Sequence, residues 1–134
     1  MSDSFDTNPF DKGLAIRREV LGADYVDAAM AAADDFTRPM QELSTAWCWG
    51  EVWSRPGLAR RDRSLINIAM IAVLNRPQEL RLHLRAALNN GVTREEIQEV
   101  LLQVAVYAGI PAGMASFHLA RDVLAEVDGG PDAG

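Results

Sequence analysis

The sequence predicts an all-α protein, a single-domain bundle of about six to seven helices, on three observations. No segment alternates apolar and polar residues over the length of a strand, and no Asn-Gly turn joins two β-branched runs. Apolar residues recur instead at helical spacing along most of the chain. Glycine and proline stand where such helices would begin and end. The 134 residues, of which 49% are hydrophobic and 24% charged, suit one domain with one core.

Glycine, proline and capping residues define the expected helix ends. Gly22 and Gly109 would each end a helix, and Pro77 suits the first turn of one. Thr93 with Glu96 forms a capping box, in which each side chain covers a free backbone N–H. Helices are therefore expected at residues 14–21, 24–34, 39–53, 61–75, 77–90, 93–108 and 111–127. They would form one helical domain at 13–127, between a flexible arm at 1–12 and a disordered tail at 128–134.

Charge and hydropathy exclude several classes of function. The formal net charge of −6 argues against binding to nucleic acid or to an anionic membrane. The longest apolar stretch, residues 65–74, contains Asn67 and is too short to span a bilayer. The first twelve residues lack the basic start and the apolar core of a signal peptide. We therefore expect a cytoplasmic protein with no nucleic-acid or membrane partner.

Lysine, cysteine and histidine are too scarce for common cofactor chemistry. Lys12 is the only lysine and lies in the polar N-terminal arm, so a buried Schiff-base lysine is not expected. Cys48 is the only cysteine, which allows no intramolecular disulfide and no Cys-x-x-Cys pair. His83 and His118 fall on different helices without the spacing of metal ligands. The sequence therefore predicts neither a metal nor another cofactor.

Glu79 and His83 form the strongest candidate for a proton-transfer site. They stand four residues apart on the helix that begins near Pro77. His83 shares the apolar face with Leu80 and Leu84, and Glu79 lies one turn earlier, within reach of the imidazole. A carboxylate beside a partly buried imidazole can hold it in one orientation and at a useful pKa. The alternative is a histidine that is satisfied within the core.

The segment WCWGEVW places aromatic side chains beside a carboxylate. Trp49 and Trp53 are spaced for one helical face, with Glu51 between them in sequence. This combination suits a desolvated cleft, in which fixed dipoles act strongly on a charged substrate. The alternative is that the tryptophans belong to the core.

A group of arginines follows this segment. Its members are Arg55, Arg60, Arg61 and Arg63. In an acidic chain, this positive patch suits a small anionic ligand such as a carboxylate. The alternative is a solvated helix start, where positive charges oppose the helix dipole. Further along, Tyr107 precedes a helix break and could direct its hydroxyl into a pocket, although such a tyrosine also suits simple packing.

Two expected helices are apolar over more than one face. Asn67 is the only polar residue between positions 65 and 74, and Leu102 and Val106 lie outside the main apolar stripe of the helix at 93–108. A chain of this length has limited capacity to cover two such helices completely. Because an interface between subunits would bury them, we expect a homo-oligomer.

An ordered series of segments resembles the γ-carboxymuconolactone decarboxylase family. The segments are IRREVLGADYVDAAM, WGEVWSRPGL, RSLINIAM, LNRPQELRLHLRAALNNGVTREEIQEVLLQVAVYAGIPAG and SFHLA, and they cover about residues 14–127. The resemblance implies an all-helical fold like that of alkyl hydroperoxidase D. It also implies a ring-like hexamer with pockets where the subunits meet.

The wider superfamily includes redox members that carry a Glu, then a Cys-x-x-Cys, then a His. When His83 is placed on that histidine, Ser64 falls on the glutamate, and Arg76 and Glu79 fall on the two cysteines. The thiol chemistry is therefore absent, and His83 with Glu79 resembles the decarboxylase branch. A peroxide-linked reductase stays open as an alternative enzyme. A noncatalytic helical subunit that binds a ligand or a partner is a further alternative.

The activity that the resemblance implies is decarboxylation of 4-carboxymuconolactone to 3-oxoadipate enol-lactone, without a cofactor, in bacterial degradation of aromatic compounds through protocatechuate. This small anionic lactone carries its own electron sink, so the protein must provide placement, stabilisation of an oxyanion and a proton. His83 would be the proton donor or the oxyanion partner, oriented by Glu79, and Glu51 would be a second acid. A member of the superfamily could also act on another small lactone or carboxylate.

The same resemblance suggests how the substrate would be held. Arg63, with Arg60 or Arg55, would bind the acetate arm. Trp49 and Trp53 would exclude water around the carboxylate that leaves.

Overall fold

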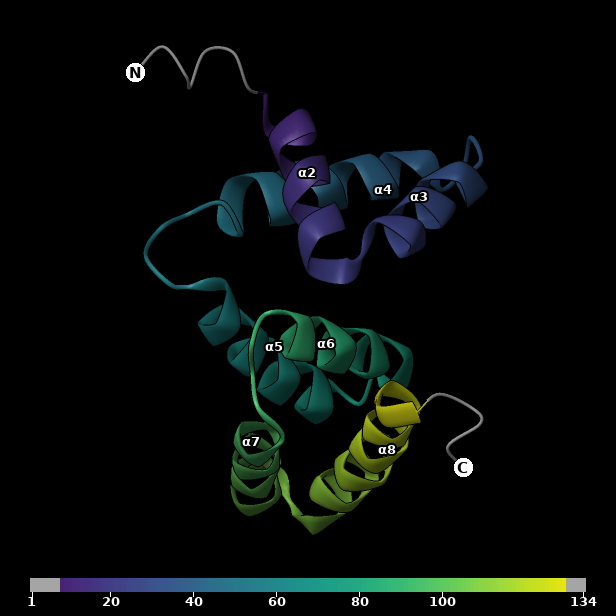
Figure 1. Cartoon of the computed structure of the whole chain (residues 1–134). Helices are drawn as coiled ribbons and strands as arrows, with labels where there is room; N and C mark the ends of the chain where they lie inside the picture. Colours follow the sequence, from purple (N-terminus) through teal and green to yellow (C-terminus); the bar gives the residue numbers. More distant parts are fainter. Residues whose placement is uncertain (1–7, 130–134) are drawn as a thin grey trace. The chain divides into compact units, whose positions relative to one another are not determined.

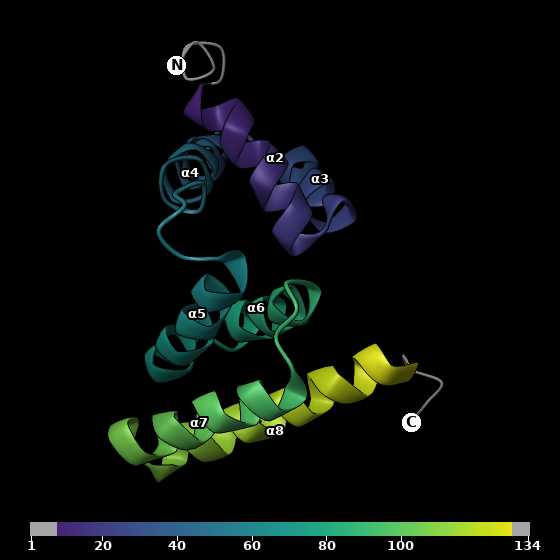
Figure 2. The same cartoon turned by 60° about the vertical axis from the view of Figure 1, so that its left-hand side comes forward.

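The computed structural model describes residues 8–129, and these residues form helices and no strand. The all-α prediction is confirmed. The described chain divides into two compact units, the first ending at Ala59 and the second beginning at Arg60. The single helical domain expected at 13–127 stays a prediction. Figure 1 shows the helices of each unit, and Figure 2 shows them turned by 60°. No helix within residues 8–129 has both the length and the apolar content needed to cross a bilayer.

The first unit contains α2 (Pro9–Leu21), α3 (Ala23–Ala32), α4 (Arg38–Leu43) and η1 (Ser44–Val52). α2 begins at Pro9 instead of residue 14, because proline suits the first helical position and Asn8 caps it. The side chain of Asn8 accepts a hydrogen bond from the backbone N–H of Asp11 at 2.8 Å. The prediction of a flexible arm was therefore wrong for residues 9–12, and residues 1–7 lie outside the described chain.

The segment η1 is a π-helix, in which each backbone hydrogen bond closes a turn of five residues. The sequence analysis expected an ordinary helix over 39–53, so the position was right and the helix type was wrong. At the end of the segment, the N–H of Trp53 donates to the carbonyl of Cys48 at 3.0 Å, which continues the π pattern. π-Helices are rare and occur frequently at functional sites.

Two glycines allow α2 and η1 to pack with their backbones in close contact. A Cβ atom on Gly13 would clash with the carbonyl oxygen of Thr45 and with the backbone of Gly50. A Cβ atom on Gly50 would in turn clash with the backbone of Pro9. Since no other residue lacks a Cβ, only glycine at both positions permits this packing.

The second unit contains α5 (Arg60–Leu74), α6 (Pro77–Asn89), α7 (Arg94–Ala108) and α8 (Ile110–Gly129). The expected helix ends are confirmed here. Pro77 stands in the first turn of α6, and Gly91 and Gly109 adopt φ angles of 92° and 113° directly after α6 and α7. The predicted tail was wrong for residues 128–129, which belong to α8, and residues 130–134 lie outside the described chain.

The capping box at the start of α7 is present and has an additional partner. The N–H of Thr93 donates to the Glu96 carboxylate at 2.9 Å, and the N–H of Glu96 donates to the Thr93 hydroxyl at 3.1 Å. Arg61 of α5 donates to the same carboxylate. The hydrogen bond from Thr93, followed by that from Arg61, holds the pKa of Glu96 below its ordinary value. One carboxylate therefore caps α7 and connects it to α5.

All four helices contribute to the core of the second unit. Its fully buried side chains include Ile68, Leu84, Ile97, Leu101 and Val123. The apolar stripes that were predicted for α6 and α7 form part of this core. Burial of a large aliphatic side chain stabilises a fold by about 1.5–3 kcal/mol. In both views α7 and α8 lie side by side, which agrees with their contacts.

Candidate functional site

His83 and Glu79 lie one turn apart on α6, as the sequence predicted. His83 is half-buried, whereas Glu79, in the first turn, is exposed. Burial lowers the pKa of His83 below its ordinary value of 6.5, and the carboxylate of Glu79 raises it by a smaller amount. Glu79 therefore acts on the imidazole, but desolvation has the larger effect. The lowered pKa favours the neutral imidazole at pH 7.

The neutral state of the imidazole limits the chemical roles that are open to His83. A neutral imidazole donates a hydrogen bond through one nitrogen and accepts one through the other. It can therefore donate to an oxyanion while it is uncharged, or it can take up a proton and become a positively charged imidazolium. Of the two roles that the sequence suggested, the pKa of His83 favours the oxyanion partner over the proton donor.

Trp49 and Trp53 form a stacked pair within the first unit. Their ring centroids are 4.7 Å apart with an interplanar angle of 29°, and both side chains are buried. The predicted shared face is confirmed. Glu51 lies on the same π-helix and is exposed, and Trp47 is 64% exposed and takes no part in the stack. The role of Trp49, Trp53 and Glu51 in a site stays a prediction.

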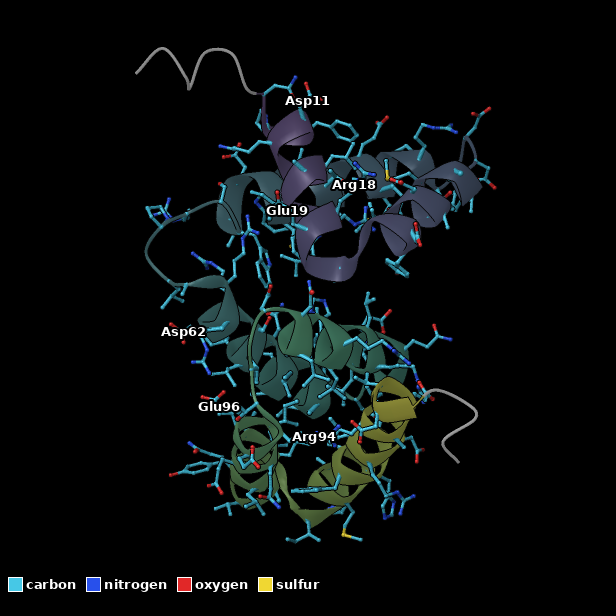
Figure 3. The ribbon with its side chains drawn as sticks, in the orientation of Figure 1. Asp11, Arg18, Glu19, Asp62, Arg94 and Glu96 are labelled. Carbon is cyan, nitrogen blue, oxygen red and sulfur yellow. The ribbon has the colours of Figure 1, made fainter. Side chains whose placement is uncertain are left out.

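The arginines at the start of α5 divide into two groups. Arg61 pairs with Glu96 and lies 3.7 Å from a carboxylate oxygen of Asp62. Figure 3 labels Asp62 and Glu96, the two carboxylates that accompany Arg61. These ion pairs offset the unfavourable interaction of Arg61 with the positive end of the α5 dipole. Arg61 therefore has a structural role.

Arg60 and Arg63 are the arginines of α5 that stay candidates for an anion. They are three residues apart, so they lie on one side of the helix, and Arg63 is half-buried. Arg55 is exposed in the segment that follows η1. Arg63 is the stronger candidate, because a partly desolvated guanidinium binds a carboxylate more strongly than a fully solvated one does.

Tyr107 lies on α7 and is 84% exposed. It lines a hollow of about 500 Å³ between α5 and α7, together with apolar side chains such as Leu65, Ile66 and Val104. All residues that line this hollow come from α5 and α7, so His83 and Glu79 are not among them. The structure thus does not bring Tyr107 together with the α6 pair, and its role in substrate binding stays a prediction.

A buried polar pair escaped the sequence analysis. The side chain of Asn90, at the C-cap of α6, donates to the hydroxyl of Ser64 at 3.0 Å. Ser64 is fully buried in the first turns of α5, on the same face as Ile68 and Ala72. The signal in the sequence was a serine at core spacing. This hydrogen bond fixes the start of α5 against the end of α6, and so helps to place Arg63.

Cys48 and the acidic residues limit other chemistries. Burial raises the pKa of the Cys48 thiol, and the nearby Arg17 lowers it by a smaller amount. Since the thiolate is the reactive form, this environment does not favour the redox alternative. Within the described part of the chain, no three side chains of His, Cys, Asp or Glu converge in a way that could hold a metal ion.

Comparison with known proteins identifies the family. Residues 38–122 match the carboxymuconolactone decarboxylase family. The chain belongs to this family. The resemblance that the sequence suggested is therefore confirmed, and so is the all-helical fold like that of alkyl hydroperoxidase D.

Two relatives of this family have named activities. The chain is 43% identical over 127 residues to 4-carboxymuconolactone decarboxylase of Acinetobacter baylyi, covering 95% of each chain. It is 49% identical over 111 residues to nitrosuccinic acid decarboxylase of Metarhizium robertsii, covering 83% of this chain and 78% of the relative. An uncharacterised 15.0 kDa protein of Paracoccus denitrificans is 37% identical over 83 residues, about 60% of each chain. The chain is a decarboxylase of the family, and its two named relatives differ in substrate.

The lowered pKa of His83 predicts a loss of stability on mild acidification. An unfolded histidine titrates at about pH 6.5, whereas the folded imidazole titrates lower, so the unfolded chain binds more protons between the two values. The free energy of unfolding should therefore decrease as the pH falls below about 6.5. Urea denaturation between about pH 7.5 and 5.5 should show a steeper decrease for the wild type than for a His83→Gln variant.

Other titrations do not interfere with this comparison. The contribution of Glu96, whose pKa is lowered, is present above about pH 4.5 and is lost only below it. If the wild type and the His83→Gln variant had parallel pH profiles, His83 would not be held in its neutral form by burial.

Proposed function

We propose that this protein decarboxylates 4-carboxymuconolactone to 3-oxoadipate enol-lactone without a cofactor, as a step in the degradation of aromatic acids through protocatechuate. The observation that carries the proposal is the neutral, half-buried imidazole of His83 beside Glu79, in a member of this family. The relative of the same activity covers nearly the whole chain, which supports this substrate.

The substrates of the two named relatives have a common chemistry. In each, a carboxylate leaves from a carbon that is conjugated to an electron acceptor. The acceptor is the unsaturated lactone carbonyl in carboxymuconolactone and the nitro group in nitrosuccinate. Both molecules also carry a second carboxylate on a CH₂ arm attached to the same carbon. We infer that the protein recognises this arrangement.

The electron movement on the lactone defines what the protein must do. The bond from the ring carbon to the carboxylate breaks, CO₂ leaves, and the electron pair passes through the ring double bond onto the carbonyl oxygen. A proton then adds to the ring carbon next to the carbonyl, which gives the enol-lactone. Negative charge therefore develops on the carbonyl oxygen, and a hydrogen-bond donor directed at that oxygen accelerates the reaction.

In this scheme, His83 donates its N–H to the developing oxyanion. A neutral imidazole suits this role because its N–H can donate to the oxyanion and no counter-ion has to leave the ring first. Glu79 orients the ring from one turn away. Glu51 is a second acid that would deliver the proton to carbon, and Trp49 and Trp53 would keep water from the leaving carboxylate.

The second carboxylate of the substrate requires a cation. Arg63, with Arg60 or Arg55, would bind it, because guanidinium groups match carboxylates in geometry. Arg61 instead pairs with Glu96, the capping residue of α7. The binding energy of this arm would hold the leaving carboxylate in the productive orientation.

Nitrosuccinate is a second candidate substrate. The relative named for it has the higher identity of the two, 49%, over a smaller part of the chain. The imidazole would donate in this case to the nitronate that forms when the electron pair moves onto the nitro group. The same residues would therefore serve both substrates, and only the shape of the site would decide between them.

We also propose that the protein is a homo-oligomer, with the hexamer of the family as the expected form. Exposed apolar side chains in the second unit support this proposal. They include Ile66, Met70, Val73, Val106 and Ile110, of which Val106 is 77% exposed. Surfaces of this kind mark interfaces more often than they face water.

The proposed activity predicts CO₂ release without any added cofactor. Purified protein incubated with 4-carboxymuconolactone should release CO₂ and form the enol-lactone, and nitrosuccinate should be tested in parallel. His83→Ala should lower kcat by about 10²-fold or more, as expected for loss of a positioned donor. His118→Ala, which removes an exposed histidine of α8, should leave kcat unchanged. Equal kcat values for His83→Ala and the wild type would exclude His83 from the reaction.

The proposed binding of the second carboxylate predicts an effect on KM. Arg63→Met should raise KM by about tenfold or more, because a hydrogen bond to a charged group contributes about 1.5–3 kcal/mol. Arg61→Met removes a neighbouring positive charge whose partner is Glu96, and it should leave KM within about twofold of the wild type. Steady-state kinetics would decide, and an equal rise in both variants would indicate only a general effect of charge.

The proposed oligomer predicts a mass several times that of the 14.7 kDa chain. Sedimentation equilibrium at micromolar concentration should give such a mass for the wild type. Val106→Glu should reduce it, because a carboxylate in an apolar interface is strongly unfavourable. A monomeric wild type would contradict this proposal and would leave the proposed reaction untouched.

A further inference from the structure

Arg17 is a charged residue in the interior of the first unit. It is 6% exposed and lies on the buried face of α2 together with Gly13, Ile16 and Val20. The sequence analysis did not single it out, although an arginine at core spacing was a visible signal. Buried arginines are uncommon unless a carboxylate neutralises them.

The hydrogen-bond partners of Arg17 are all neutral. One terminal nitrogen, Nη1, donates to the side-chain oxygen of Gln41 at 2.9 Å and to the hydroxyl of Thr45 at 3.0 Å. The same nitrogen lies 3.6 Å from the sulfur of Met30. Within residues 8–129, no carboxylate contributes to the electrostatic surroundings of Arg17. Burial accordingly lowers the pKa of Arg17, and only Tyr25 and Cys48 oppose this effect.

This arrangement is unfavourable for stability. Burial of a charge that lacks a counter-ion is strongly unfavourable, and apolar residues of similar volume often stabilise a fold better. Packing between α2 and its neighbours could therefore be achieved with a methionine at this position. The presence of a guanidinium at this position must therefore be explained by its hydrogen-bond partners and not by packing.

Its partners lie where an α-helix becomes a π-helix. Gln41 belongs to α4, and Thr45, which is fully buried, is the second residue of η1. The Thr45 hydroxyl donates to the Gln41 carbonyl at 2.7 Å, and the same carbonyl accepts the N–H of Ser44. The change of helix type disturbs the regular backbone pairing at this junction, and the side chains of Arg17 and Thr45 supply hydrogen bonds there.

We propose that Arg17 is a positioning residue, which holds residues 44–52 in the π-helical form and so fixes the Trp49–Trp53 stack and Glu51 for the reaction. The proposal rests on the proposed function for its kinetic consequence. Arg17 itself contacts no reacting atom in this scheme. It acts through η1, whose register determines which side each tryptophan faces.

The proposal predicts that activity and stability separate in an Arg17→Met variant. Met is apolar and of similar length, and Thr45 keeps its hydrogen bond to Gln41 in the variant. The urea midpoint should therefore stay equal to that of the parent protein or rise. By contrast, kcat should fall by about tenfold or more, because small displacements of catalytic groups have effects of this size.

The tryptophan pair gives a signal that does not depend on activity. Trp47 is exposed, and Trp47→Phe in every protein tested leaves Trp49 and Trp53 as the only tryptophans. Stacked indoles couple in circular dichroism, so the parent should show an exciton couplet. Arg17→Met should reduce this couplet, and so should Thr45→Val, which removes the hydroxyl partner in η1.

Arg18 provides the matched control. It is the next residue on α2, is labelled in Figure 3, and forms an exposed ion pair with Asp27 at 3.0 Å. Arg18→Met should change neither the couplet nor kcat.

Three results would overturn the proposal. The first is a couplet in Arg17→Met that equals that of the parent, and the second is a kcat of this variant that equals that of the parent. The third is a loss of activity together with a lowered urea midpoint or a failure to fold. This third result would mean that Arg17 has only a structural role. If the parent protein decarboxylates neither substrate, the proposed function fails. The couplet and the urea midpoint then decide alone whether Arg17 fixes η1.

Discussion

Desolvation of basic side chains is the constraint on which the candidate chemistry depends. His83 on α6 and Arg17 on α2 both have a lowered pKa, and in both the largest cause is burial. For His83 the result is a neutral ring that can donate a hydrogen bond at pH 7. For Arg17 the charge persists, and the surrounding neutral oxygens must stabilise it. In each case, helix packing sets the chemical state of the side chain.

The reaction proposed for this chain requires few functional groups from the protein, and the described residues include candidates for each of them. The substrate supplies the electron sink, so the protein needs a donor for one oxyanion and a cation for one carboxylate. In the proposal, His83 supplies the first. Arg63, which is half-buried on α5, is the candidate for the second. A short chain of helices can meet these needs, and a small change in the shape of the site would suffice to change the acceptor group it accommodates.

The sequence predicted most of the helices because their signals are local. The capping box at Thr93, the proline at Pro77 and the glycine at Gly109 each act within a few residues of a helix end. Glu79 and His83 could be predicted as a pair for the same reason, because residues that are four positions apart on one helix are neighbours. The start of α2 was missed because Asn8 and Pro9 stand before a polar turn with no apolar stripe to announce a helix.

Other features could not be read from the sequence because they depend on contacts distant in the chain. The π-helical form of η1 goes together with packing against α2 through Gly13 and Gly50, which neither segment reveals alone. The partner of Arg61 is thirty-five residues away, so its structural role was hidden among the other arginines. The division at Ala59 is likewise a property of packing, since no run of glycine, serine or acidic residues separates the two units.

Because Glu96 both caps α7 and pairs with Arg61, its protonation affects how the second unit unfolds in acid. The carboxylate closes the first turn of α7 and also holds Arg61, so its protonation weakens both interactions in a single event. The contacts of α5 and of α7 at this point therefore both depend on the titration of Glu96. Protonation of Glu96 should consequently weaken the α5–α7 side of this unit as one event, whereas the ion pairs of Arg81 and Arg85 on the α6–α8 side depend on a separate carboxylate, Glu126.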